Sequence, residues 1–173
     1  FNHFWSLAVE EQFYLFWPFV ILFLKPQKTL PAIIITICLA LLTRTYLYFF
    51  VGKWMATSYF TLSCMHSLGL GALLAYIKIY KPEVGKSLTH PIYVYAIFVV
   101  YILSLIFQNV YEIGWYKEII DDLLFSILSL FIIARASENG FKGGIKMILE
   151  NKFVSYSGKI SYGLYVYHLF MPP

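Results

Sequence analysis

FWSLAVEEQFYLFWPFVILFL, residues 4–24, is an apolar and aromatic stretch that is interrupted by Glu10, Glu11 and Gln12. A helix needs roughly 20 apolar residues to cross a bilayer, at a rise of about 1.5 Å per residue. Because residues 13–24 alone are too short, the helix reaches that length only by taking in the three polar residues. A carboxylate is costly in hydrocarbon, so keeping one inside this helix indicates a function or a partner for it.

The composition of the whole chain is that of an integral membrane protein. Of its residues 60% are hydrophobic, 20% are aromatic and only 13% are charged, and the mean hydropathy is +0.71. These values lie outside the range of soluble domains. The net charge of +4 does not indicate nucleic-acid binding, because the lysines lie in short gaps between apolar runs. Cys38 and Cys64 lie within apolar runs without metal-ligand spacing, so we interpret them as core residues and predict no metal.

Six apolar stretches have the length of membrane-spanning helices, and the last of them is cut short by the end of the chain. They predict an all-α fold, a multi-pass transmembrane bundle of about six spanning helices. The chain starts on Phe1 rather than Met and ends within an apolar run, so we expect it to be part of a longer protein. The predicted spans are Phe4 to Leu24, Leu30 to Val51, Tyr59 to Ile77, Pro91 to Phe107, Glu118 to Ala134, and Ile160 to the end.

The basic residues in the gaps between these spans predict the orientation of the chain, since Lys and Arg near helix ends are retained in the cytoplasm. The second and fourth gaps hold only Lys53 and Lys117. We therefore predict a multi-pass protein of the inner or plasma membrane, with the odd gaps cytoplasmic and Phe1 outside. The long fifth gap contains GIKMILENKF, residues 144–153, an amphipathic stretch suited to the membrane surface. The odd gaps hold Lys25 and Lys28, then Lys78, Lys81 and Lys86, then Arg135, Lys142, Lys146, Lys152 and Lys159.

Several ionisable side chains lie within the predicted spans. Glu10 and Arg44 lie about 20 Å from the cytoplasmic ends of their helices, and His66 lies about 12 to 15 Å from its own. Asp121 and Asp122 lie about 20 Å up the fifth span, and there we favour a solvated outer rim over ligands. Intramembrane charges usually face the bundle interior or a water-filled cavity, so the pattern predicts a polar chamber in the outer half of the bilayer.

Each of these side chains also has a purely structural interpretation, which the sequence leaves open. Glu10 could sit at a helix N-terminus, where the helix dipole favours an anion. Arg44 could extend to the outer surface or form a structural ion pair. His66 could bond to a neighbouring helix, and His168, near mid-membrane in the last span, could pack against tyrosines.

Three stretches resemble the membrane-bound acyltransferase family 3. FWSLAVEEQFYLFWP, residues 4–18, is similar to the family signature, in which a Trp-Ser-Leu-x-x-Glu-x-x-Phe-Tyr run opens a transmembrane helix. GLGALLAY, residues 69–76, resembles the family's Gly-x-Leu-Leu-Ala helix. ISYGLYVYHLF, residues 160–170, resembles its closing Ser-Tyr-x-Leu-Tyr-x-x-His run. The three matches bracket essentially the whole chain, and the first is the most specific.

The resemblance implies an O-acyltransferase with no bound cofactor. Its co-substrate would be a cytoplasmic acyl-CoA, and its acceptor a hydroxyl of a cell-surface glycan or lipid-linked sugar at the lipid bilayer. Residues 1–173 would be the C-terminal part of a single transmembrane acyltransferase domain. Members of the family carry an upstream helix with an Arg and a His, so the chain alone is expected to be inactive.

The resemblance, together with the membrane depth of Arg44 and His66, suggests roles for individual residues. Acyl transfer needs a base, donors for the oxyanion and exclusion of water from the thioester. The upstream histidine is implied to be the base, with Glu10 orienting it, and Arg44 would hold Glu10 ionised or bind a donor phosphate. The catalytic residues expected in this chain are Glu10 and His168, and those expected to bind substrate or donor are Trp5, Ser6, Tyr14, Arg44, His66 and Tyr162.

The third span departs from the family pattern. Many members have an Arg there and an acidic residue two positions on, whereas this chain has Cys64 and His66. Whether Cys64 and His66 make the substrate or donor contact that the family makes at these positions is therefore left open.

Two other classes of function remain as alternatives. Charges at mid-membrane also mark translocation paths, so the helices could belong to a transporter or flippase for a lipid-linked glycan. No two segments repeat one another, and no span is interrupted by paired Gly or Pro, which disfavours that alternative. A non-catalytic membrane anchor would not need Glu10, Arg44 and His168.

Overall fold

The computed structural model describes residues 4–52, 60–138 and 140–167 of the chain. Within these ranges every regular element is a helix and no strand is present, which confirms the predicted all-α class there. The elements are α1 (Phe4–Phe23), α2 (Pro26–Tyr46), the π-helix η1 (Leu47–Val51), α4 (Thr61–Tyr80), α5 (Pro82–Leu88), α6 (Pro91–Tyr111), the π-helix η2 (Tyr116–Asp121), α7 (Asp122–Ser137), α8 (Gly143–Leu149) and α9 (Lys152–Tyr167).

Three helices among the described residues are long and apolar enough to cross a membrane: Pro26–Val51, Thr61–Tyr80 and Pro91–Tyr111. They coincide with the second, third and fourth predicted spans. The predicted count of six spans is not confirmed and stays a prediction. The bounds of α1 match the first predicted span, and the fifth is divided between η2 and α7.

The expected long connection before the last span is largely helical. α8 and the start of α9 occupy most of residues 143–159, so the last helix begins at Lys152 rather than at Ile160. Two exposed residues, Glu150 and Asn151, separate α8 from α9, and the Asn151 side chain accepts a hydrogen bond from the backbone N–H of Phe153 at 2.8 Å. An Asn in this position opens a helix, which is why hydropathy alone placed the boundary too late.

The helix limits follow from proline and from left-handed backbone positions. Pro26, Pro82 and Pro91 each lie in the first turn of their helix, where the missing N–H removes no hydrogen bond. Gly52, with φ of 67°, ends η1 in the left-handed conformation that glycine adopts without strain. Glu112 ends α6 in the same region with φ of 49°, so the chain turns back toward η2.

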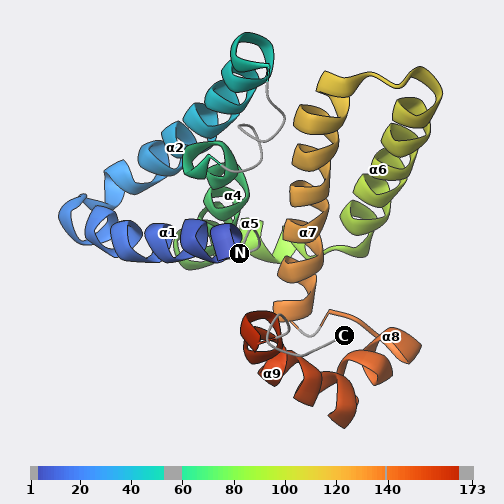
Figure 1. The fold of residues 1–173 in the computed structure, drawn as a ribbon. Helices are drawn as coiled ribbons and strands as arrows, with labels where there is room; N and C mark the ends of the chain where they lie inside the picture. Colours follow the sequence, from blue (N-terminus) through green and yellow to red (C-terminus); the bar gives the residue numbers. More distant parts are fainter. Residues whose placement is uncertain (1–3, 53–59, 139, 168–173) are drawn as a thin grey trace.

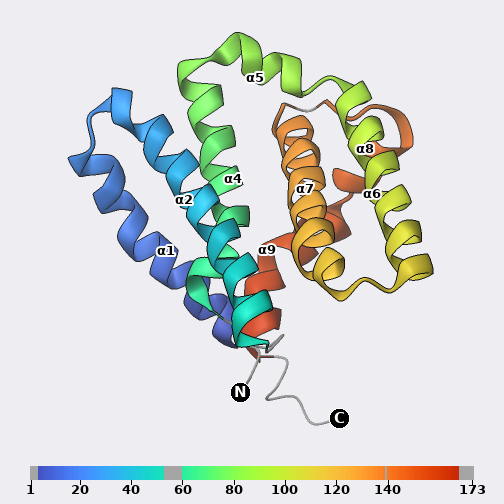
Figure 2. The ribbon, with the colours of Figure 1, turned by 90° about the horizontal axis from the view of Figure 1, so that it is seen from above.

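The helices pack as two groups. α1, α2 and α4 lie side by side, α6 and α7 form a second pair, and α5 connects the two (Figures 1 and 2). The most extensive contact is between α2 and α4, where Ile33 and Ala40 are fully buried. Gly69 of α4 makes this contact possible, because a Cβ there would lie 2.6 Å from Cγ1 of Ile37. α4 also packs against α7, which joins the two groups.

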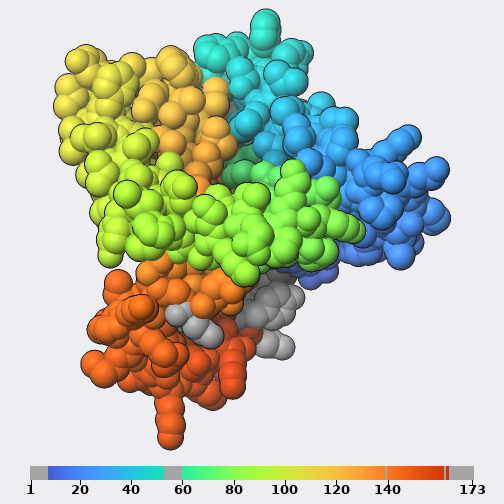
Figure 3. All heavy atoms as spheres, turned by 180° about the vertical axis from the view of Figure 1, so that it is seen from behind, coloured from blue at the N-terminus to red at the C-terminus, as the bar shows by residue number. Residues whose placement is uncertain are grey.

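Most large apolar side chains of these helices point outward. Leu22 and Phe23 of α1 and Leu42 of α2 are among those that remain mainly exposed. Such a surface suits lipid, where helices associate through close packing and polar contacts rather than through burial from water. α8 and α9 extend beyond the end of α7 as a separate group (Figures 1 and 3).

Candidate functional site

A cluster of polar and charged side chains lies where α2, α4 and α7 meet. Arg44, in the last turn of α2, is only 6% exposed. Its Nη1 lies 3.2 Å from Oδ2 of Asp122, the first residue of α7, and its Nη2 lies 3.8 Å from Oε2 of Glu118. The Arg44 Nε–H donates to the backbone carbonyl of Glu118. The guanidinium is thus held by two carboxylates and a carbonyl. We call Arg44, His66, Glu118 and Asp122 the Arg44 cluster.

The same Asp122 oxygen also binds His66 of α4. Nε2 of His66 lies 3.0 Å from Asp122 Oδ2, and Nδ1 lies 3.0 Å from the backbone carbonyl of Ser63. His66 is only 2% exposed, and Asp122 therefore contacts side chains from two different helices, Arg44 of α2 and His66 of α4.

Adjacent aspartates at the junction of η2 with α7 contact different helices, because neighbouring residues on a helix point about 100° apart. A π-helical turn holds one more residue than an α-helical turn, and such turns recur at functional sites. At the junction of η2 with α7, Asp122 faces Arg44 and His66, whereas Asp121 faces α6. There the Ser104 hydroxyl donates to Oδ1 of Asp121 and lies 3.0 Å from the hydroxyl of Tyr116. Since the single Ser104 hydrogen goes to the carboxylate, the Tyr116 hydroxyl is the donor to Ser104.

This arrangement corrects the interpretation of Asp121 and Asp122 as a solvated rim. Asp121 is only 7% exposed, and its Oδ2 is buried without a hydrogen-bond partner among the described residues. Asp122 is partly exposed, but both of its contacts are with buried basic groups. The one sequence feature that could have indicated the ion pair between Asp122 and Arg44 was their similar predicted depth in the membrane.

A cavity of about 430 Å³ opens beside the cluster, between η2, α6 and α7. Three carboxylates and two cations line it together with aromatic and amide side chains, a mixture that suits a ligand rich in hydroxyl groups. Among the described residues no group of His, Cys, Asp and Glu could hold a metal ion. The lining residues are Arg44, Tyr101, Leu105, Gln108, Lys117, Glu118, Asp121, Asp122 and Phe125. We call this the Arg44 cavity.

Two of the predicted site residues, Arg44 and His66, come together in this cluster. Glu10 does not join it, because Arg44 is paired with Asp122 and Glu118 instead, so the hypothesis that Arg44 holds Glu10 ionised is wrong. Glu10 lies exposed on α1, which packs against α4, whereas Val9 and Phe13 of the same helix are buried.

The other predicted residues lie on α1 or α9 or outside the described ranges. Tyr14 is exposed on α1. Trp5 and Ser6 lie in the first turns of α1, and Tyr162 lies in α9. His168 lies outside the described residues. The roles assigned to all of these residues stay predictions.

The fold and the cluster define a class of protein. Helices long and apolar enough for a membrane carry polar and charged side chains that contact one another across three helices, as in membrane proteins that bind or transform a polar substrate within the bilayer. The family model described as an acyltransferase domain matches residues 1–171, and the chain belongs to this acyltransferase family.

Two curated relatives are O-acetyltransferases by name. The chain is 30% identical over 181 residues to the O-acetyltransferase OatA of Staphylococcus aureus strain NCTC 8325 / PS 47, and equally to that of strain COL. Each alignment covers 96% of this chain but 28% of OatA, so the chain spans less than a third of these relatives. No solved structure matches the chain.

Proposed function

We propose that the intact protein is a membrane O-acetyltransferase that moves an acetyl group from an acyl-CoA to a hydroxyl of a cell-surface glycan. The family match over residues 1–171 carries this proposal. The names of the relatives indicate that the transferred group is acetyl and that the acceptor atom is oxygen. Because the chain spans 28% of OatA, the activity is proposed for the intact protein, and we expect residues 1–173 alone to be inactive.

The proposed reaction exchanges a thioester for an ester. The acceptor oxygen attacks the thioester carbonyl, the C–S bond breaks, and CoA leaves as the thiol after taking up the proton that the acceptor loses. A base must remove that proton, and fixed donors must stabilise the oxyanion. We assign the base to the upstream histidine implied by the resemblance and its orientation to Glu10, with His168 as the second catalytic candidate.

The Arg44 cluster would then form the polar wall of the reaction chamber. Asp122 and Glu118 hold the Arg44 guanidinium in one orientation, so the remaining N–H groups that face the Arg44 cavity are preorganised. Preorganised donors stabilise developing negative charge more effectively than flexible ones. The acceptor would bind in this cavity, where the carboxylates can accept hydrogen bonds from sugar hydroxyl groups.

The proposed orientation brings the two substrates in from opposite sides. With the odd gaps in the cytoplasm, α5 and the C-terminal end of α7 face the cytoplasm, and the Arg44 cluster lies toward the outside. The acyl donor would enter from the cytoplasm and the glycan from outside. The acetyl group would therefore cross part of the membrane inside the protein.

The test is O-acetylation of surface glycans, measured by mass spectrometry in cells that express the intact protein. We compare the wild type with Glu10→Gln and Asp122→Asn at equal membrane abundance, and use Glu83→Gln, an exposed acid on α5, as the matched control. Loss of the acetyl mass in the first two variants alone supports the proposal. Unchanged acetylation together with loss of the glycan from the surface would indicate the transporter instead.

A further inference from the structure

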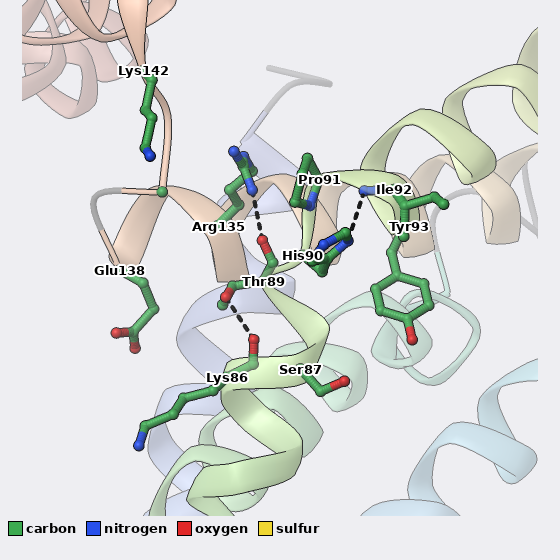
Figure 4. Close-up of a pocket in the computed structure, with 11 residues that line it drawn as sticks. Lys86, Ser87, Thr89, His90, Pro91, Ile92, Tyr93, Arg135, Glu138 and Lys142 are labelled. Atoms are coloured by element: carbon green, nitrogen blue, oxygen red, sulfur yellow. Dashed lines mark hydrogen bonds between the residues drawn. The ribbon is translucent and has the colours of Figure 1, made fainter.

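A second cavity lies at the opposite end of α7 from the Arg44 cluster. It has a volume of about 780 Å³ and is formed by the end of α5, the start of α6, the end of α7, and Glu138, Gly140 and Lys142. Figure 3 views the side of the molecule where α5 and the start of α6 adjoin the end of α7, and Figure 4 shows the lining residues. They are Lys86, Ser87, Thr89, His90, Pro91, Ile92, Tyr93, Arg135, Glu138, Gly140 and Lys142. We call this the Arg135 cavity.

Arg135 is a fixed cation in this cavity. Its Nη1 donates to the backbone carbonyl of Thr89 at 2.7 Å (Figure 4), and its guanidinium lies over the ring of Phe141 at 5.3 Å from the centroid. Neither contact neutralises the charge, and no carboxylate pairs with Arg135 in the described part of the chain. The remaining guanidinium N–H groups form the planar donor set that suits a phosphate.

The charge balance of the lining is positive. The one carboxylate, Glu138, is paired with Lys78 at 3.0 Å, and Lys78 lies outside the lining. Lys142 is exposed and forms no ion pair with any described residue, whereas Lys86 pairs only with the exposed Glu83 at 3.3 Å. An anion entering the cavity would therefore meet cations that have no strong internal partner.

The start of α6 adds donors to the same wall. The α6 helix has 21 residues, and its N-terminal end carries a partial positive charge at the edge of the cavity. Nδ1 of His90 accepts a hydrogen bond from the backbone N–H of Ile92 at 3.4 Å, so in the neutral ring Nε2 carries the hydrogen and can donate. Tyr93 stacks on Phe131 and gives the cavity an aromatic wall.

We propose that the Arg135 cavity binds the phosphate-bearing nucleotide end of the acyl-CoA donor. The choice of acyl-CoA as the ligand rests on the proposed function, whereas the binding of a phosphate-bearing group rests on the residues of the cavity. The volume fits a nucleotide with several phosphates rather than a single small anion. Arg135 lies 13 residues after Asp122 on α7, which separates the two sites by about 20 Å along the helix. The long pantetheine arm would extend from this cavity toward the Arg44 cluster and bring the thioester there.

The first experiment measures binding of adenosine 3′,5′-bisphosphate to the intact protein in lipid nanodiscs by calorimetry. We compare the wild type with Lys142→Gln and with Lys86→Gln/Lys142→Gln. Lys81→Gln/Lys152→Gln serves as the control, since both of those lysines are exposed and lie outside the lining. The double variant in the cavity is expected to bind roughly tenfold more weakly, because charge-assisted bonds to phosphate are lost. The control is expected to bind as the wild type does.

Binding should also weaken as the salt concentration rises, and more steeply in the wild type than in the double variant. In the acyl-transfer assay the same variant should raise KM for acetyl-CoA about tenfold with little change in kcat. Arg135→Gln is less informative, because it also removes the contacts with Thr89 and Phe141.

Three results separate this inference from its rivals. Equal binding in all variants, or equal loss in the control, overturns it. Absence of bisphosphate binding in the wild type, with a Lys142-dependent loss of co-purified phosphatidylglycerol, assigns the cavity to a lipid phosphate and also overturns it. Lys142-dependent nucleotide binding without any acetyl transfer supports the inference and counts against the proposed function alone.

Discussion

At the scale of single residues, Asp122 is the central group of the candidate site. One of its carboxylate oxygens contacts both Arg44 and His66, so a single carboxylate joins side chains from two different helices. Removing one partner of a buried ion pair leaves an uncompensated charge, which is far less favourable than replacing the whole set with apolar groups. Asp122 also lies next to His66, which stands where the resemblance to the acyltransferase family predicts an acidic residue. The structure places an acidic residue from α7 next to that position.

Asp122→Asn should destabilise the protein by about 1–3 kcal/mol, because Arg44 keeps Glu118 as a partner but loses its closer carboxylate. Thermal unfolding of the detergent-purified protein, followed by fluorescence, measures this change. Glu83→Gln is the matched control, since Glu83 forms only an exposed pair with Lys86 that contributes little.

A double-mutant cycle with Arg44→Gln provides the check on this prediction. If Asp122 and Arg44 act as a pair, the double variant should be more stable than the sum of the single changes predicts. Strict additivity would mean that the ion pair contributes nothing to stability.

At the scale of helices, the contact between α2 and α4 positions Arg44 and His66 relative to each other. The helices approach closely because Gly69 has no side chain where Ile37 packs. Gly71, two residues further along α4, has open space around its Cβ position. The two glycines therefore form a matched pair in one helix, one at the contact and one away from it.

Gly69→Ala should destabilise the protein by about 1–3 kcal/mol, because Ile37 must move to admit the new methyl group. Gly71→Ala should instead be neutral or stabilise by up to about 1 kcal/mol, because alanine favours the helix more than glycine does. Unfolding midpoints of both variants measure the difference. Adding Ile37→Ala to Gly69→Ala should recover part of the loss, and a failure to do so would show that the close approach is not set by this contact.

At the scale of the whole molecule, two sites lie at opposite ends of α7. The Arg44 cavity lies near the junction of η2 with α7, and the Arg135 cavity lies where α7 ends. If the chain has the orientation predicted from its lysines, the first faces outward and the second faces the cytoplasm. This separation matches a reaction whose donor and acceptor come from different sides.

The orientation predicts the accessibility of single cysteines. With Cys38 and Cys64 replaced by alanine, a cysteine at Asn109 should react with a membrane-impermeant maleimide in intact cells. A cysteine at Ser87 should react only after the membrane is permeabilised. The reverse pattern would invert the predicted topology and move the Arg135 cavity to the outer side.

Much of the local structure was predictable because a helix in lipid must satisfy its own backbone hydrogen bonds, so length and hydropathy reveal it. The helical class, three membrane-length helices and the polar residues inside them follow from the order of residues along the chain. The π-helical turns and the early start of α9 were not predicted, because single extra residues and local caps leave hydropathy almost unchanged.

By itself the sequence determined the membrane class, the positions of the apolar helices and the family, because each depends on local composition or on short motifs. Only the tertiary structure decided which charges meet. It paired Arg44 and His66 with Asp122, left Glu10 outside the cluster, and separated Asp121 from Asp122 by turning them to different helices. The physical reason is that an ion pair across helices depends on the rotation of each helix about its axis and on its neighbours, and neither is encoded in hydropathy.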